Sequence, residues 1–253
     1  MDPGSIDVSV VIAARDEAQN IRDCITSVRW AREILVVEDG SADDTSEIAE
    51  AAGAIVIHNP FVTIGGQRNA AVARATSRWV LVVDADERGS DQLGAEISQA
   101  IQSNAFEAYR IPRRNFFLGG EIKHGGWERD RPVRLFLSTI RYNESRVHEH
   151  VEVKGAVGEL TSALLHEPYA SLDRWFAKLR TYSRWWAEDR FEKGKRCSIV
   201  SVVSRPPLRF LTMYLIRGGW MDGSRGALLA CMAGMSVAAK YAQLWSLAKQ
   251  RRA

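Results

Sequence analysis

The sequence predicts an α/β fold, with a mixed sheet flanked by helices and a basic, helical region after it. The first hundred residues alternate between apolar strand segments and helical segments, which is typical of a doubly wound parallel sheet. The composition changes after Pro168, where the chain becomes helical and rich in Lys and Arg. A hydrophobic fraction of 46% and a charged fraction of 26% are ordinary for a globular protein of 253 residues.

The first half contains four predicted strands and four predicted helices. We expect strands at residues 8–14, 34–38, 54–58 and 79–83, and helices at residues 18–30, 43–52, 67–75 and 92–103. The fourth strand is apolar without alternation, which indicates burial on both faces. Its carboxyl end is therefore a rigid support for the residues that follow it.

Shorter strands with intervening glycines follow, at residues 109–112, 116–118, 133–137, 147–153 and 159–165. They predict a mixed, partly antiparallel extension of the sheet that forms the far wall of a cleft. We accordingly divide the chain into residues 1–5, interpreted as a cloning scar, a ligand-binding α/β half (6–104), an acceptor-side mixed sheet (105–169) and a helical membrane-association region (170–253).

The C-terminal region is strongly basic. Residues 168–253 hold 16 Lys and Arg but 5 Asp and Glu, a net charge of +11, whereas the rest of the chain carries −8. Helices are expected at residues 171–193, 208–217 and 224–247, the second beginning only after Pro206 and Pro207. Between Arg225 and Lys240 lie 14 uncharged residues, fewer than the roughly 20 that span a bilayer. The tail is therefore expected to lie in the interface of an anionic membrane, the alternative being a helical cap or an oligomer contact.

Cysteine usage indicates a reducing compartment. Cys24, Cys197 and Cys231 are odd in number and have no CxxC spacing. We expect three reduced thiols in the cytoplasm.

Carboxylates follow three of the four predicted parallel strands. They are Asp16 and Glu17, then Glu38 and Asp39, then Asp84, Asp86 and Glu87. Ligands bind at the carboxyl ends of the strands in such sheets. An Asp-X-Asp triplet at a strand end can hold a hard divalent cation, with water and phosphate oxygens completing its shell.

Several ordered motifs resemble one family. They are Ser9-Val-Val-Ile-Ala-Ala-Arg-Asp-Glu17, Glu38-Asp-Gly-Ser-Ala-Asp-Asp-Thr45, Gly66-Gln-Arg-Asn-Ala-Ala71 and Asp84-Ala-Asp-Glu87. Together they resemble the nucleotide-sugar glycosyltransferases of family 2, which have the GT-A (Rossmann-like) fold. Glu38 stands where that family usually has Asp. Residues 125–136 and Val147-His148-Glu149 are similar to the branch that adds glucose or heptose to the inner core of lipopolysaccharide or lipooligosaccharide.

The resemblance implies roles for individual residues. Asp39 would bind the uracil or ribose of a UDP-sugar, with Ala13 and Glu17 lining the base pocket. Arg68 would reach the base or the diphosphate, and Asp84 the ribose or sugar. Asp86, with Asp84 beside it, would hold Mg²⁺ or Mn²⁺ at the diphosphate.

An inverting transfer, as the resemblance implies, also needs a base for the acceptor hydroxyl. Asp130 is our first candidate, with Glu128 and Glu149 as alternatives. A salt bridge from Glu149 to Arg134 or Arg146 is an equal alternative to catalysis.

Other polar residues have two interpretations each. His148 and His150 would share one strand face, where they are either structural or a metal ligand. Arg131 and Arg134 would bind the diphosphate or an acidic acceptor, or pair with the acids of the sheet.

We therefore expect a peripheral enzyme on the cytoplasmic face of the membrane that transfers a hexose from a UDP-sugar to an anionic, lipid-linked lipopolysaccharide core acceptor. A polyprenyl-phosphate-linked acceptor and a non-catalytic membrane-bound scaffold are the alternatives. A dinucleotide-dependent dehydrogenase is disfavoured because no Gly-x-Gly-x-x-Gly follows the first strand. Nucleic acid is not an expected partner, since the Trp-rich apolar tail suits lipid better.

Overall fold

The computed structural model describes residues 5–60, 62–143, 149–169 and 171–250. The chain divides into two compact units. The first comprises Met1–Arg113 and Arg131–His166, and the second comprises Arg114–Asp130 and Glu167–Ala253. Each unit is described by itself.

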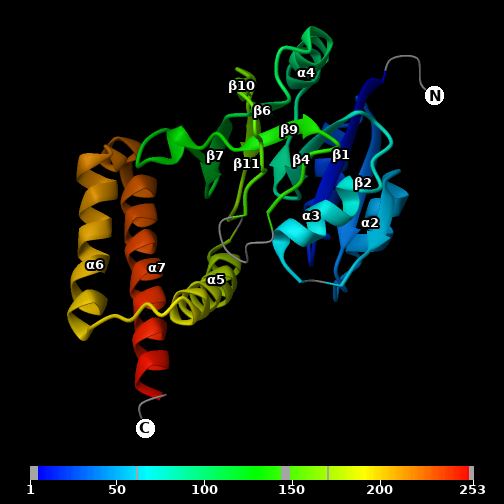
Figure 1. The fold of residues 1–253 in the computed structure, drawn as a ribbon. Helices are drawn as coiled ribbons and strands as arrows, with labels where there is room; N and C mark the ends of the chain where they lie inside the picture. Colours follow the sequence, from blue (N-terminus) through cyan, green and yellow to red (C-terminus); the bar gives the residue numbers. More distant parts are fainter. Residues whose placement is uncertain (1–4, 61, 144–148, 170, 251–253) are drawn as a thin grey trace. The chain divides into compact units, whose positions relative to one another are not determined.

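A seven-stranded mixed sheet forms the centre of the first unit (Figure 1). Its strands are β1 (Ile6–Ala14), β2 (Ala31–Glu38), β3 (Ile55–His58), β4 (Trp79–Asp84), β6 (Ala108–Arg110), β9 (Val133–Leu137) and β10 (Gly158–Glu159), in the spatial order β10-β6-β9-β4-β1-β2-β3. The first four strands are parallel, and β9 runs antiparallel between β4 and β6. The predicted parallel half with a mixed extension is confirmed.

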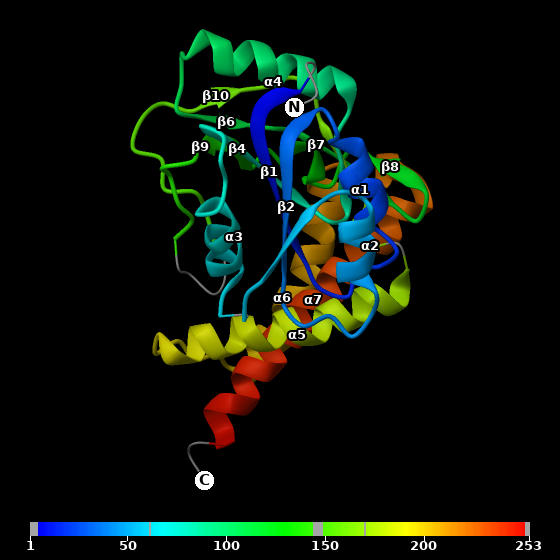
Figure 2. The ribbon, with the colours of Figure 1, turned by 90° about the vertical axis from the view of Figure 1, so that its right-hand side faces the viewer.

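Helices cover both faces of this sheet (Figure 2). They are α1 (Ile21–Ser27), α2 (Thr45–Ala51), α3 (Ile64–Val72) and α4 (Asp91–Ser103). Val8, Val10 and Ile12 of β1 face the core shared with α1, α2 and α4. Val11 faces the opposite core, which α3 covers. This alternation follows from the two-residue period of a strand.

Two short strands extend the region that follows β4. They are β5 (Glu87–Arg88) and β11 (Leu164–His166), which pair antiparallel with His166 opposite Glu87. This register brings a histidine from late in the chain next to the Asp84–Glu87 turn.

The second unit combines a hairpin with three long helices. Its elements are β7 (Arg113–Phe117), β8 (Gly120–Ile122), η1 (Trp127–Arg129), α5 (Leu172–Glu192), α6 (Ile199–Leu211), η2 (Thr212–Ile216), η3 (Gly219–Asp222) and α7 (Gly223–Gln250). The helices α6 and α7 lie side by side, joined by η2 and η3 (Figure 1). Phe117, Ile122, Trp175 and Met213 share one buried cluster, so the hairpin is part of this unit's core.

Several element boundaries differ from the prediction. The helix expected at residues 18–30 is confined to α1, because the loop before it is held by a hydrogen bond from the Ala18 amide to Asp43 Oδ2. The strand expected at 159–165 is two strands, β10 and β11. Of the strand expected at 147–153, residues 147 and 148 lie outside the described residues, and the rest contributes one bridge, from Val151 to Tyr142.

The expectation that a helix starts only after Pro206 and Pro207 is wrong. The helix α6 begins at Ile199 and runs through both prolines. Proline removes a backbone donor but has a helical φ, and α7 supports the helix here by close packing. A Cβ on Gly234 would lie 3.2 Å from the Pro206 carbonyl oxygen.

The argument that the tail is too short to span a membrane is also not supported. Two stretches among the described residues, Ile199–Ile216 and Gly219–Gln250, are long and apolar enough to cross a bilayer by length and composition alone. Core helices pass the same test, so this finding does not establish a span.

A substitution at Gly65 would test how closely α3 packs. A Cβ there would clash with the carbonyl oxygen of Asn143. An ordinary Gly→Ala change inside a helix stabilises it by about 1 kcal/mol, whereas we expect Gly65→Ala to lower the free energy of unfolding by about 1–3 kcal/mol through overpacking. Urea unfolding measures this. Gly155→Ala is the control, because its Cβ would make only an ordinary 3.6 Å contact with Glu107. Equal stability of the two variants would contradict the packing.

Candidate functional site

The carboxyl ends of β1, β2 and β4 lie at one edge of the sheet. Ala13 of β1 is in register with Val37 of β2 on one side and with Asp84 of β4 on the other. Asp39 comes two residues after Val37. The strand register therefore confirms that the acidic strand ends meet at one place.

Side chains of the β2–α2 loop hold the β1–α1 loop. The Asp16 amide donates to Ser41 Oγ (3.0 Å), and Asp16 Oδ1 accepts from the Ala42 amide (2.8 Å). The Glu17 amide donates to Thr45 Oγ1 (2.9 Å). Much of the Gly-Ser-x-Asp-x-Thr motif therefore serves to hold the two loops together.

Glu38 is also structural. Its buried carboxylate accepts a hydrogen bond from the Ser41 amide and lies 3.1 Å from His58 Nδ1. Burial alone would raise the pKa of Glu38, but these hydrogen bonds outweigh burial and lower it. Asp39, the next residue, pairs with Arg15 Nη1 at 3.0 Å. Of these two acids, Asp39 is therefore the candidate for contact with a ligand.

Asp84 is surrounded by three guanidinium groups. Arg68 Nη2 lies 2.6 Å from Asp84 Oδ1, Arg113 Nη2 lies 3.0 Å from Oδ2, and Arg134 Nη2 also donates to Oδ2. Burial alone would raise the pKa of Asp84, but the charges of Arg134 and Arg68 outweigh burial and hold the pKa below its ordinary value. Asp84 is therefore ionised and fully engaged as a counter-ion.

Glu87 shares the same arginines. Its fully buried carboxylate lies 2.5 Å from Arg113 Nε and 3.2 Å from Arg134 Nη2, and it accepts the Asp84 amide proton at 2.8 Å. Burial raises the pKa of Glu87, with Arg134 opposing the rise. The last acid of the Asp-Ala-Asp-Glu turn is therefore buried against these arginines and orients the first acid.

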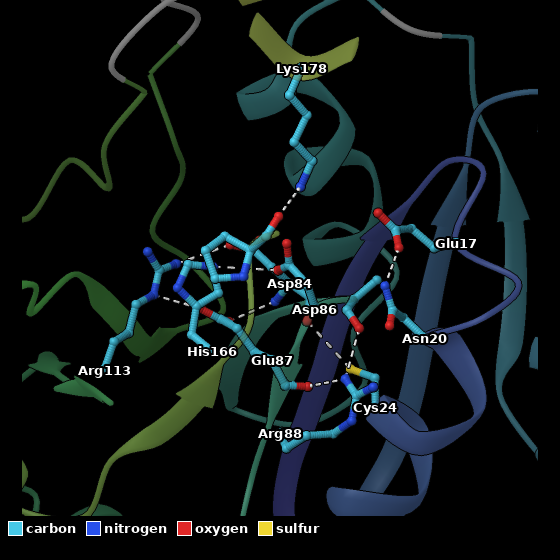
Figure 3. Close-up of polar contacts among 12 residues, drawn as sticks. Glu17, Asn20, Cys24, Asp84, Asp86, Glu87, Arg88, Arg113, His166 and Lys178 are labelled. Carbon is cyan, nitrogen blue, oxygen red and sulfur yellow. Dashed lines mark hydrogen bonds and ion pairs between the residues drawn. The ribbon is translucent and has the colours of Figure 1, made fainter. Parts of the chain in front are cut away.

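Asp86 faces a different partner. Its Oδ1 lies 3.6 Å from His166 Nε2, and both side chains are 13% exposed. Figure 3 shows His166 beside Asp86 and Asp84, next to Arg113. Sequence reasoning missed both His166 and Arg113. Nothing in their local sequence marks them, because their place depends on strand pairing across about 80 and 30 residues.

The Asp86 and His166 pair suits a divalent cation. Mg²⁺ or Mn²⁺ is commonly held by one or two protein ligands, with phosphates and water completing the octahedron. Among the described residues no cluster of three or more His, Cys, Asp and Glu side chains could hold a metal ion. A metal here would depend on a bound ligand for most of its shell.

The remaining predicted site residues lie in several places. Glu149 pairs with Arg68 Nη1 at 3.0 Å, a partner different from the two considered. Arg131 pairs with Glu159 at 3.3 Å on the surface. His150 Nδ1 lies 2.9 Å from Asn143 Nδ2, and His148 lies outside the described residues.

The two other candidate bases belong to the second unit. Glu128 Oε2 accepts the Gly126 amide proton at 2.8 Å, and Asp130 follows the 3₁₀ turn η1. The amide of Asp130 donates to the Trp127 carbonyl at 3.3 Å. Both acids are therefore held on one short, ordered loop.

All three cysteines are free, as predicted. Cys24 is buried behind β4, with its Sγ 3.5 Å from the Asp84 carbonyl oxygen. Burial raises the pKa of its thiol. Cys24 is therefore a core residue with little thiolate character.

A mixed sheet with helices on both faces, whose parallel half carries carboxylates at its ligand edge, is a GT-A-like fold. The family model for glycosyl transferase family 2 matches residues 9–142, more than half of the chain. The chain belongs to this family and is a glycosyltransferase.

Relatives extend the likeness beyond that region. The lipopolysaccharide core biosynthesis glycosyltransferase LpsC of Rhizobium meliloti is 28% identical over 88% of this chain and 86% of its own. The uncharacterized glycosyltransferase RP128 of Rickettsia prowazekii is 26% identical over 87% and 80%. Among solved structures, S. aureus TarS 1–349 in complex with UDP has a TM-score of 0.52 at 14% identity, covering 96% of this chain and 91% of that one. The structural likeness concerns the fold.

Arg134 tests the buried ion cluster. Removing its guanidinium leaves two buried carboxylates with fewer counter-charges, so we expect Arg134→Ala to lower the free energy of unfolding by about 3–5 kcal/mol. Arg131→Ala, which removes an exposed pair three residues away, should cost about 0–1 kcal/mol. Urea unfolding of both variants makes the comparison. If Arg134→Ala lowers the free energy of unfolding by as little as Arg131→Ala does, the cluster adds nothing to stability.

Acid should destabilise the first unit in a defined range. The pKa values of Glu33, Asp43 and Glu96 are lowered by hydrogen bonds that together outweigh burial, from ordinary values of 4.5, 3.8 and 4.5. The unfolded chain then binds protons first, so their stabilisation is present above about pH 4.5 and is lost as the pH falls through the lowered values. Glu87 has the opposite effect, because its pKa is raised. It lowers the stability as the pH rises above 4.5 and does not contribute to the loss in acid.

We therefore expect the free energy of unfolding, from urea curves at several pH values, to fall steeply below pH 4.5. Glu33→Gln, which removes one of these acids, should make the fall shallower. A flat profile between pH 4.5 and pH 3 would contradict the assignment.

Proposed function

We propose that this glycosyltransferase is inverting and metal-dependent, and that it transfers a hexose from a UDP-sugar to a membrane-embedded lipopolysaccharide core acceptor. Glucose is the expected sugar from the resemblance of the motifs. The observation that carries the proposal is the pairing of Asp86 with His166 beside the arginines around Asp84, at the ligand edge of the sheet. The LpsC relative, named for lipopolysaccharide core biosynthesis, supports the acceptor class.

The nucleoside would bind near Asp39. Its carboxylate is 18% exposed, and Ala13 on the neighbouring strand provides a small side chain against which a base can pack. Glu17 lines the same loop, where its Oε2 accepts a hydrogen bond from Asn20 at 2.6 Å. A carboxylate at this place accepts hydrogen bonds from a ribose hydroxyl or a uracil N–H.

The diphosphate would lie toward Asp86 and Arg68. The Arg68 guanidinium already bridges two carboxylates, Asp84 and Glu149, so it is held in one orientation. A planar guanidinium binds phosphate oxygens in pairs. Asp86 and His166 would hold Mg²⁺ or Mn²⁺, which when bound neutralises charge on the departing UDP.

The acceptor hydroxyl must lose a proton as it attacks the anomeric carbon. A carboxylate is the base in this proposal, with Asp130 the first candidate and Glu128 and Glu149 the alternatives. The ion pair of Glu149 with Arg68 occupies one of its two carboxylate oxygens. As the new glycosidic bond forms, the bond between the anomeric carbon and the UDP oxygen breaks, UDP leaves with its electron pair, and the carboxylate holds the acceptor proton.

The enzyme would act at the cytoplasmic face of the membrane, as a peripheral protein. A lipid-linked acceptor and a basic C-terminal region agree with that location. A polyprenyl-phosphate-linked acceptor has the same chemistry, and a transfer assay with each purified acceptor distinguishes the two.

Isothermal titration tests the donor and the metal. UDP-glucose, UDP-galactose and GDP-mannose are titrated into the full chain with Mn²⁺ and with EDTA. We expect one UDP-sugar to bind only with Mn²⁺, and Asp86→Asn to weaken that binding at least about tenfold. Asp7→Asn, which removes an exposed carboxylate paired with Arg32, is the control and should bind as the unmodified chain does. Absence of nucleotide-sugar binding in every condition would refute the proposal.

A further inference from the structure

The turn between α6 and α7 exposes large apolar side chains. Leu215 and Ile216 of η2 are 55% and 78% exposed, and Trp220 and Met221 of η3 are 56% and 51% exposed. We call these four residues the apolar corner. Further exposed apolar residues continue from it along α6: Ile199, Val200, Val203, Leu208 and Leu211. Contiguous exposure of this kind marks an interaction surface.

Arginines flank the apolar corner along the chain. Residues 205–225 hold four arginines and a single acid, Asp222, and residues 123–130 hold two Lys and Arg and two Asp and Glu, so the net charge stays positive. Asp222 accepts the His124 amide proton at 2.9 Å and lies 3.0 Å from His124 Nδ1, so its charge is used within the unit. Within the described residues no carboxylate pairs with Arg209 or Arg217. Apolar side chains among cations without counter-ions suit an anionic lipid surface.

The same corner holds the loop that carries two of the candidate bases. The Gly125 amide donates to the Arg217 carbonyl at 2.9 Å, and Asp222 accepts from the amides of Lys123 (3.2 Å) and His124. Buried Met213 lies under Gly125, where a Cβ would be 3.2 Å from the Met213 methyl group. Residues 123–130 are therefore attached to the α6–α7 turn, next to which they run in Figure 1.

We propose that the apolar corner inserts into the interface of an anionic bilayer and thereby holds the acid-bearing loop 123–130 at the lipid surface. The loop would then meet the sugar of an acceptor whose lipid end remains in the membrane. The inserting surface follows from exposure and charge alone, whereas its use in presenting an acceptor rests on the proposed function. A second copy of the chain fits the surface less well, because it would bring the same uncompensated cations together.

Vesicle flotation of the full chain tests the inserting surface. Vesicles of phosphatidylcholine alone are compared with vesicles that also contain phosphatidylglycerol. We expect binding only to the anionic vesicles, reduced on the order of tenfold by the double change Ile216→Asp and Trp220→Asp. Val62→Asp, at a residue 76% exposed in the first unit, is the matched control and should bind as the unmodified chain does. Unchanged binding of the double variant, or no binding to anionic vesicles, would overturn the proposal.

Self-association is the competing outcome. If sedimentation velocity shows a dimer that the double variant abolishes, and no vesicles are bound, the surface is a contact between copies and the proposal fails. Titration with UDP-sugar and Mn²⁺ is run on the same variant, where we expect unchanged binding. Failure of the proposed function would appear in that titration, and failure of the inserting surface would appear in flotation.

Amide hydrogen exchange tests the link between the corner and the loop. Anionic vesicles should slow exchange in residues 212–222 and also in residues 123–126. In Asp222→Asn, which weakens the bonds to the Lys123 and His124 amides, we expect slower exchange only in the corner. Loop exchange that does not respond to vesicles in the unmodified chain would refute the link while leaving the flotation result intact.

Discussion

The buried ion cluster around Asp84 is the interaction on which the first unit depends. Its three guanidiniums come from α3, from the start of β7 and from β9, so one carboxylate joins the parallel half of the sheet to its antiparallel extension. Charges buried to this extent are tolerable only when each has a partner of opposite sign. The cluster therefore requires all of these elements to be in place together, and it leaves Asp86 as the acid of the turn that faces His166.

The sheet and the general location of the site could be predicted from the sequence. Apolar runs and strand ends are local features, and parallel strands bring their carboxyl ends to one edge whatever the details of packing. Asp39, Asp84 and Asp86 were therefore predictable as a group. Their individual roles were not, because Asp84 and Asp86 differ only in the partners that tertiary structure provides.

The partners of Asp84 and Asp86 lie far from them in the sequence. Arg113 and His166 reach the turn through strand registers that a single sequence does not encode in any local pattern. An ion pair was one of two interpretations of Glu149, with Arg134 or Arg146 as the partner, and the structure pairs Glu149 with Arg68 of α3. The α6 boundary was misjudged for a related reason, since the prolines were weighed by local propensity whereas packing against Gly234 maintains the helix.

The reciprocal hydrogen bonds between the β1–α1 and β2–α2 loops have a consequence for how this site can change. Asp16, Ser41, Glu17 and Thr45 connect backbone to side chain in both directions across the two loops. An insertion or deletion in one loop removes partners from the other, so neither can drift independently during evolution. Transplanting one of these loops from a relative would therefore require the other to be transplanted with it.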